Sequence, residues 1–295
     1  MHLRIKTALF AASLMMGDHA MAQPPAAAPS VRPDFAQGSL NVYRRFAPER
    51  LERMIAFYEK GLGLASLPKI TLGDGQQVML FRIGSGQIKL AAGLKPGRLY
   101  HPGAADAATG IRLYTLFFAE ESALAARFAA AGFPAPRFQD RSDGTRTALV
   151  RDPGGFTLQL IIVANAPAET YGKVEVGINV SDLARSRAFY RDFAGLEELP
   201  PVKDATLGVT KYPYRHGETT INLWSIGKAL PADTGSGGIQ YVIRNIDAVN
   251  ADAARRKVTV EEPLAAVPGF PVRTVWLNDP DGVTNYFYER ASPAK

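Results

Sequence analysis

Histidine and cysteine are the side chains that most often hold metals or act as nucleophiles, and this chain has few of either. It contains no Cys, which excludes disulfides and thiol chemistry. Two of its four His, His2 and His19, lie in an N-terminal segment with the pattern of a cleaved leader. His101 follows in a Pro-Gly loop, and His216 in an Arg-His-Gly-Glu turn. A site with two His and one carboxylate would need both, so we expect structural or surface roles for them.

Other motifs that carry chemistry are also missing from the sequence. There is no Gly-x-Ser-x-Gly nucleophile elbow and no P-loop. The Gly-Ser-Gly runs at 84–86 and 235–237 are not followed by a predicted helix, so they indicate turns rather than phosphate cradles. The segment 277–288 has the wrong residues at most positions of a calcium-binding loop.

The first 22 residues have the pattern of a secretory signal peptide. Arg4 and Lys6 form a positive start, residues 8–17 are largely apolar, and Ala20-Met21-Ala22 resembles a cleavage site. Ten apolar residues are too few for a membrane-spanning helix. We therefore predict a signal peptide at 1–22, an Ala/Pro-rich tether at 23–35, and an exported protein that is periplasmic or secreted.

The charge pattern bears on possible partners. The net charge is +6, and loss of the signal peptide removes two basic residues and one acidic residue, which leaves +5. The basic residues are dispersed, which favours a solvated surface over a nucleic-acid partner and leaves room for a mild preference for an anionic ligand. No further segment is apolar enough to span a membrane.

Internal similarity is the strongest signal in the chain. The pair Phe57-Tyr58 with the following Gly63-Leu64 recurs 132 residues later as Phe189-Tyr190 with Gly195-Leu196. The turn that begins at Asp152 recurs 127 residues later at Asp279. Two motifs that repeat in the same order at nearly the same spacing indicate a duplicated domain.

Each half of the chain divides again into two units. In the second half, apolar and polar residues alternate over 174–180, which predicts a strand, and Ser181 or Asp182 can cap the helix that ends before Gly195. The pattern of strand, helix and further strands then starts again near residue 239, and the first half reads in the same way. We therefore predict an α+β fold of four βαβββ modules, with domains at 36–164 and 172–291 and a linker at 165–171.

Three segments carry a family resemblance. Residues 177–190 and 51–64 are similar to the opening strand and helix of modules in the glyoxalase/bleomycin-resistance/dioxygenase superfamily, also called the vicinal oxygen chelate superfamily. Residues 279–282 resemble the turn before that family's last strand. The resemblance implies two tandem glyoxalase-like domains with open, curled mixed sheets, whose concave faces bind ligands. In catalytic members it implies a divalent metal held by first-strand His and last-strand Glu residues.

The positions that match those metal ligands carry other residues here. The first-strand His positions fall at Glu175, at Gly238 or Gln240, at Ser39 or Asn41, and at Arg112 or Leu113. The last-strand positions fall at Gln159 and Tyr286, with Lys89 and Asn222 in the remaining modules. One carboxylate among these positions does not make a three-ligand site, so we predict no cofactor, with a divalent metal as the disfavoured alternative.

Polar and aromatic residues remain on the concave faces that the resemblance implies. The resulting candidates for ligand binding are Asn41, Tyr43, Lys89, Gln159, Glu175, Asn179, Asn222, Gln240 and Tyr286. Such a mixture suits hydrogen bonding and stacking of a small organic molecule, although these groups could instead satisfy one another. We favour a metal-free binding protein. Alternatives are a lyase, isomerase or dioxygenase-type enzyme with Glu175 or Tyr286 as the catalytic group, and a purely structural or partner-binding module.

Overall fold

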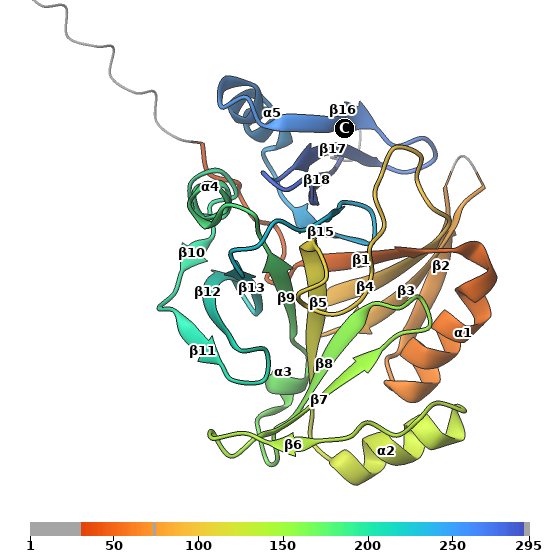
Figure 1. Ribbon diagram of the computed structural model, residues 1–295. Coiled ribbons are helices and arrows are strands. Elements are labelled where there is room, and N and C mark those ends of the chain that lie inside the picture. The colour runs from red at the N-terminus through yellow and green to blue at the C-terminus, as the bar shows by residue number, and fades with distance from the viewer. Residues whose placement is uncertain (1–30, 73–74, 292–295) are drawn as a thin grey trace, which may run out of the picture.

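A computed structural model describes residues 31–72 and 75–291 (Figure 1). The predicted signal peptide and most of the predicted tether lie outside these residues. Four successive modules of one strand, one helical segment and further strands follow one another along the chain. The predicted α+β fold of four βαβββ modules is therefore confirmed.

The elements of the first half fall into two modules. The first consists of β1 (Asn41–Phe46), η1 (Pro48–Arg50), α1 (Leu51–Ile55), the π-helix η2 (Ala56–Gly61), β2 (Ser66–Thr71), β3 (Gln77–Ile83) and β4 (Gly86–Ala92). The second consists of β5 (Thr109–Phe118), α2 (Glu121–Ala130), β6 (Gln139–Asp140), β7 (Arg146–Arg151) and β8 (Thr157–Ile162). A short helix, α3 (Ala168–Tyr171), lies in the predicted linker.

The second half repeats this order. Its first module consists of β9 (Val174–Asn179), α4 (Leu183–Ala188), η3 (Phe189–Phe193), β10 (Glu197–Glu198), β11 (Val202–Asp204), β12 (Val209–His216) and β13 (Thr219–Trp224). Its second module consists of β14 (Ala232–Asp233), β15 (Gly237–Val242), α5 (Ile246–Arg255), β16 (Thr259–Ala266), β17 (Val272–Asn278) and β18 (Thr284–Arg290). The predicted cap is present, because the Asp182 carboxylate accepts from the Arg185 N–H at 3.0 Å.

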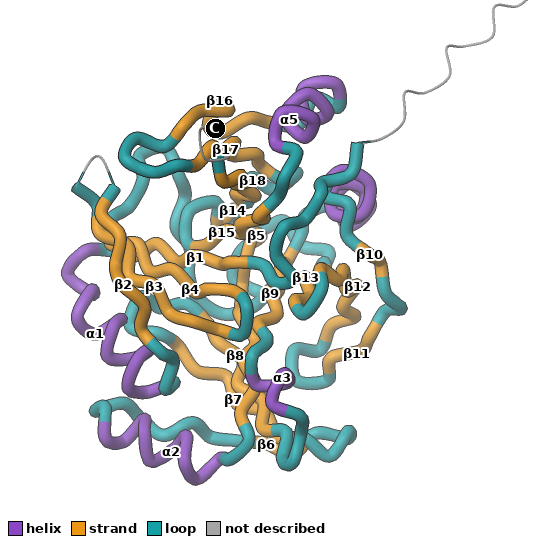
Figure 2. The backbone as a smooth tube through the Cα atoms, turned by 180° about the vertical axis from the view of Figure 1, so that it is seen from behind, coloured by secondary structure: helices purple, strands orange, loops and turns teal. Residues whose placement is uncertain are grey.

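The four modules pair in the order one with four and two with three. One sheet has the order β16-β17-β18-β15-β1-β4-β3-β2, and the other has the order β10-β12-β13-β9-β5-β8-β7-β6. Both are open, mixed sheets, as predicted. The strands occupy the middle of the molecule and the helices lie outside them (Figure 2). Each sheet takes strands from both halves of the chain, so a ligand site on either sheet is built from both halves.

The motifs that revealed the repeat are bonded to each other between the two sheets. The Tyr58 hydroxyl from module one donates to Asp152 from module two at 3.2 Å. The Tyr190 hydroxyl from module three donates to Asp279 from module four at 2.9 Å. All four side chains are buried. The Phe-Tyr pairs and the Asp-Pro turns therefore have a structural role in joining the sheets.

The two Tyr–Asp contacts differ in charge. Asp152 also accepts from the guanidinium of Arg44 at 3.3 Å, and both of these side chains have no exposed surface. Arg44 in turn lies 4.0 Å from the centre of the Phe156 ring. Asp279 accepts two backbone N–H groups, from Asp281 and Val283, but it has no ion pair among the described residues.

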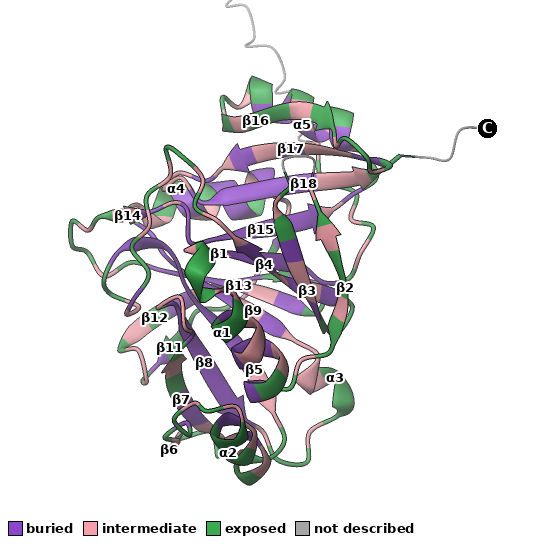
Figure 3. Ribbon diagram, turned by 90° about the vertical axis from the view of Figure 1, so that its right-hand side faces the viewer, coloured by how far each residue is buried: buried purple, intermediate pink, exposed green. Residues whose placement is uncertain are grey.

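Burial follows the layers of the fold, since the central strands are buried and the outer helices have exposed faces (Figure 3). The chain before β1 is also anchored, because Phe35 forms a β-bridge to Ile243.

No helix within 31–72 and 75–291 has both the length and the apolarity to cross a bilayer.

Candidate functional site

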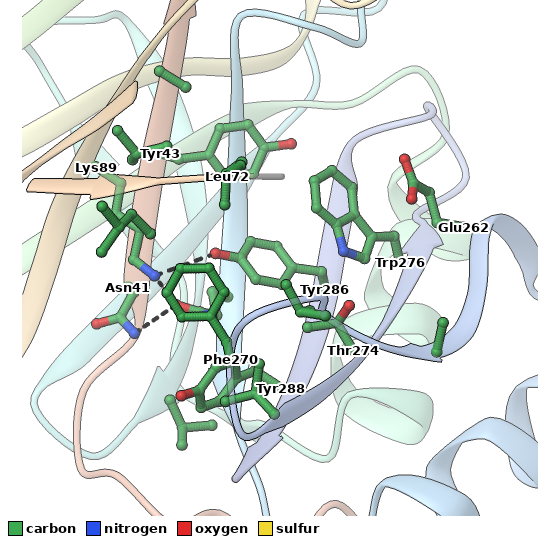
Figure 4. Close-up of a pocket in the computed structure, with 18 of the residues that line it drawn as sticks. Asn41, Tyr43, Leu72, Lys89, Glu262, Phe270, Thr274, Trp276, Tyr286 and Tyr288 are labelled. Atoms are coloured by element: carbon green, nitrogen blue, oxygen red, sulfur yellow. Dashed lines mark hydrogen bonds between the residues drawn. The ribbon is translucent and has the colours of Figure 1, made fainter. Parts of the chain in front are cut away.

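A cavity of about 470 Å³ lies on one face of the β1/β4/β15/β18 region (Figure 4). The sheet strands form its floor, β16 and β17 form one wall, and residues next to β2 and β3 contribute to another. It contains five of the nine candidates for ligand binding, namely Asn41, Tyr43, Lys89, Gln240 and Tyr286. Two strands come from each half of the chain, so neither half alone forms the cavity.

Strand register explains why these residues meet. Asn41 is directly opposite Gln240, which is opposite Tyr286, which is opposite Trp276. Side chains that face one another across a ladder lie on the same face of a sheet. This polar and aromatic row therefore crosses four strands at one level of the cavity floor.

Lys89 ends in the centre of this row. Its Nζ donates to the Gln240 Oε1 at 2.7 Å and lies 3.5 Å from the Tyr286 hydroxyl. Gln240 Oε1 also accepts from the Asn41 amide at 2.7 Å. Both nearby acceptors are neutral, and Lys89 forms no ion pair in the described part of the chain. Burial lowers the pKa of the Lys89 amine to about 8.

Aromatic rings line the same cavity as the amine. Trp276 and Tyr286 are stacked with ring centres 5.1 Å apart, and the Tyr43 ring lies 5.9 Å from that of Tyr286. Tyr43 fits there because Gly238 faces it, and a Cβ at this glycine would lie 2.2 Å from the ring. Burial raises the pKa of Tyr43 to about 12 and that of Tyr286 further, so both hydroxyls keep their protons near neutral pH.

The other sheet carries a comparable polar row, but its residues do not line the cavity. Glu175 is opposite Thr115, which is opposite Gln159. The Asn222 amide donates to Glu175 at 2.8 Å, and the Thr115 hydroxyl donates to Gln159 at 3.1 Å. Burial raises the pKa of Glu175. These groups satisfy one another, and none of the candidates on this sheet lines the cavity described above.

Asn179 is separate from both rows. Its amide donates to the Ala108 carbonyl at 3.0 Å, and it is buried near the end of β9. The two remaining His are also outside the cavity lining. His216 is buried with its ring centre 4.1 Å from that of Phe35, and the His101 carbonyl accepts from Arg112.

Three of the uncertain register positions are resolved by the sheets. Asn41 rather than Ser39 lies in the cavity, and Gln240 rather than Gly238 supplies a polar group there. In the second module neither Arg112 nor Leu113 lies opposite Glu175, and Thr115 occupies that position after a register shift between Ile111 and Leu113. Arg112 instead pairs with Asp233 at 3.2 Å.

Sequence reasoning also missed several residues of the cavity wall. They are Trp276 and Phe270, together with Leu72, Glu262 and Tyr288. Period-two alternation along a single strand does not show which residues cover the floor formed by the other strands. That information depends on the pairing of modules one and four.

The donor atoms of either row do not fit a first-row divalent metal. The cavity row offers two amides, a phenol and an ammonium, and the second row offers one carboxylate with two amides and a hydroxyl. Such metals need imidazole, thiolate or several carboxylate ligands. No group of three or more His, Cys, Asp or Glu side chains is placed to hold a metal among the described residues.

The paired βαβββ modules form a four-module protein with two open sheets, and known proteins share this fold. Glyoxalase I from Zea mays superposes with a TM-score of 0.64 at 18% identity, over 86% of this chain and 92% of that one. A protein from Bacillus subtilis subsp. subtilis str. 168, provisionally named a dioxygenase, superposes with a TM-score of 0.62 at 13% identity, over 87% and 86%. These likenesses show the fold.

Residues 44–160 match the family model described as Glyoxalase/Bleomycin resistance protein/Dioxygenase superfamily. The match shows a domain of that superfamily, which is also called the vicinal oxygen chelate superfamily, over residues 44–160, and the shared fold extends the likeness to the rest of the chain. No curated protein matches the sequence significantly.

Proposed function

We propose that this chain is an exported binding protein that holds one small aromatic molecule in the β1/β4/β15/β18 cavity, without the divalent metal of the family. The observation that supports this most strongly is the combination of Lys89 with the rings of Tyr43, Trp276 and Tyr286 in one cavity. The rings offer apolar contact surface to a flat ligand, and the amine suits one polar group at its end.

The alternative of an enzyme has less support from the side chains. Burial keeps the Tyr286 hydroxyl protonated, so it is unsuited to act as a base near neutral pH. Glu175 is the better acid/base candidate by its raised pKa, but it is held by Asn222 on the other sheet. The two catalytic candidates therefore do not act on one ligand in the cavity.

We expect small aromatic molecules to bind, and Trp276→Ala to weaken that binding about tenfold or more. Loss of the indole removes a large apolar contact surface from the cavity wall, which is worth about 1.5–3 kcal/mol when fully covered by ligand. Isothermal titration calorimetry measures the affinities of the unaltered chain and the variant for 2-naphthol, 2-naphthoate and 2-naphthylmethylammonium, three aromatic ligands that differ in charge.

Leu149→Ala is the control for this experiment, because Leu149 is 46% exposed on β7 of the other sheet. It should leave each affinity unchanged. The proposed function is wrong if none of the three compounds binds, or if Trp276→Ala binds them as tightly as the unaltered chain.

A further inference from the structure

Lys89 lacks a negatively charged partner inside the cavity. An ammonium has three N–H donors, and here one meets an amide oxygen at 2.7 Å and a second points at a phenol oxygen at 3.5 Å. Removal of an ammonium from water is costly unless an anion or several hydrogen bonds replace the lost hydration. The protein supplies only part of that replacement.

The remaining charges of the cavity lining do not supply the missing anion. Arg45 on β1 and Arg290 on β18 are positive, and neither forms an ion pair within the residues described. Glu262 on β16 is the acidic residue of the lining, and its carboxylate pairs with Lys95 at 2.5 Å. In Figure 4 this carboxylate lies beyond Trp276, on the side away from Lys89. The lining therefore has an excess of positive charge.

We propose that the ligand of this cavity is an aromatic monocarboxylate, whose carboxylate pairs with Lys89 while its ring lies among Tyr43, Trp276 and Tyr286. This inference rests on the proposed function. Lys89 supplies one positive charge at the centre of the row, which one carboxylate balances, and the further positive charges of Arg45 and Arg290 favour an anion over a neutral or cationic ligand. A carboxylate is planar and accepts hydrogen bonds on two oxygens. One oxygen can accept the remaining N–H of Lys89, and the other can accept from water.

The pH dependence gives a signature of this pairing. The titratable and charged groups that line the cavity with Lys89 are Tyr43 and Arg45 on β1, Tyr286, Tyr288 and Arg290 on β18, and, beyond Trp276, Glu262 on β16. The pKa of Lys89 is about 8, and that of Tyr43 is about 12. Between pH 7 and 9 the free chain therefore loses the Lys89 proton, and carboxylate affinity should fall, with a limit of tenfold per pH unit above the pKa.

A matched set of probes tests the proposal on the full chain. Calorimetry with 2-naphthoate, 2-naphthamide and 2-naphthylmethylammonium compares three charges on one ring system. We expect the carboxylate to bind about tenfold or more tightly than the amide, since a charge-assisted hydrogen bond to a half-buried partner is worth about that factor or more. Lys89→Met should abolish this preference, and Lys89→Arg should keep it without the fall between pH 7 and 9.

The control is Lys228→Met, the same substitution at an exposed lysine outside the cavity, which should keep the preference. The inference is overturned if the amide or the ammonium binds as tightly as the carboxylate, if Lys89→Met keeps the preference, or if carboxylate affinity rises with pH. Trp276-dependent binding without a carboxylate preference would leave the proposed function standing. Failure of all three probes would instead reject the proposed function.

Discussion

Asp152→Asn should lower the free energy of unfolding by about 3–5 kcal/mol, because it leaves the buried Arg44 guanidinium without a counter-charge. The new amide nitrogen would also face the Arg44 N–H and the Tyr58 O–H in place of a carboxylate oxygen. A guanidinium has no acceptor atom, so it cannot adapt to a second donor. Urea denaturation of the unaltered chain and the variant at pH 7 measures the difference.

Asp279→Asn is the matched comparison, because Asp279 has the same place in the repeat but no ion pair among the described residues. Its Oδ1 can still accept the N–H groups of Asp281 and Val283, and the Tyr190 hydroxyl can accept from the new amide. We expect this variant to be at least as stable as the unaltered chain at pH 7. If both variants lost the same unfolding free energy, the Arg44–Asp152 ion pair would not be the cause of the destabilisation.

The stability gained by Asp279→Asn should depend strongly on pH. Burial raises the pKa of Asp279 from its ordinary value of 3.8 to about 7. The unfolded chain therefore releases this proton first as pH rises, and the folded chain retains it. The stability contribution of the protonated carboxyl is fully present below pH 3.8 and is lost as pH rises through about 7.

Asparagine does not titrate, so the difference in unfolding free energy between variant and unaltered chain isolates this carboxyl. It should grow from near zero at pH 4 by as much as about 1.4 kcal/mol per pH unit, to a plateau above pH 7 of up to about 4 kcal/mol. Denaturant titrations at four or five pH values measure it. A difference that is constant over this range would mean that Asp279 stays ionised in the folded chain.

The modules could be predicted from sequence because each is encoded locally. Alternation over 174–180 and the Asp182 cap specify a strand and a helix from neighbouring residues alone. The Phe-Tyr and Asp-Pro motifs repeat because each Tyr–Asp contact joins two adjacent modules of the chain. The structure adds a physical reason for their recurrence, which sequence comparison within the chain could not provide.

The pairing of modules one and four could not be predicted in this way, since strands more than 190 residues apart meet at the β1–β15 ladder. The strands β2 and β16, which contribute to the cavity wall, were among those missed. β2 contains Pro68, and β16 contains the run Glu261-Glu262-Pro263, neither of which alternates as a half-buried strand does. Both lie at sheet edges, where proline is tolerated and one side of the backbone is unpaired. Because these strands were not predicted, the part of the cavity wall that they form was not predicted either.

The equivalent polar rows of the two sheets differ in their surroundings. In the row with Glu175, Thr115 and Gln159, Thr115 donates to Gln159 and Asn222 donates to Glu175, so these groups have partners within the protein, as our alternative of mutual satisfaction allowed. The row with Gln240 and Tyr286 lies open to a cavity, with Lys89 in its centre. The sequence identified candidate residues in both rows. Only the packing around each row shows which one forms hydrogen bonds within the protein and which one lines a candidate ligand site.

The central claim is that a small organic molecule binds to this chain without a divalent metal. Native mass spectrometry of protein purified without chelator, with 2-naphthoate added, tests both parts in one measurement. We predict a single one-to-one adduct that carries no iron, manganese, nickel or zinc and forms equally after treatment with EDTA. A stoichiometric metal in the folded chain, or an adduct that forms only while that metal is present, would contradict the account.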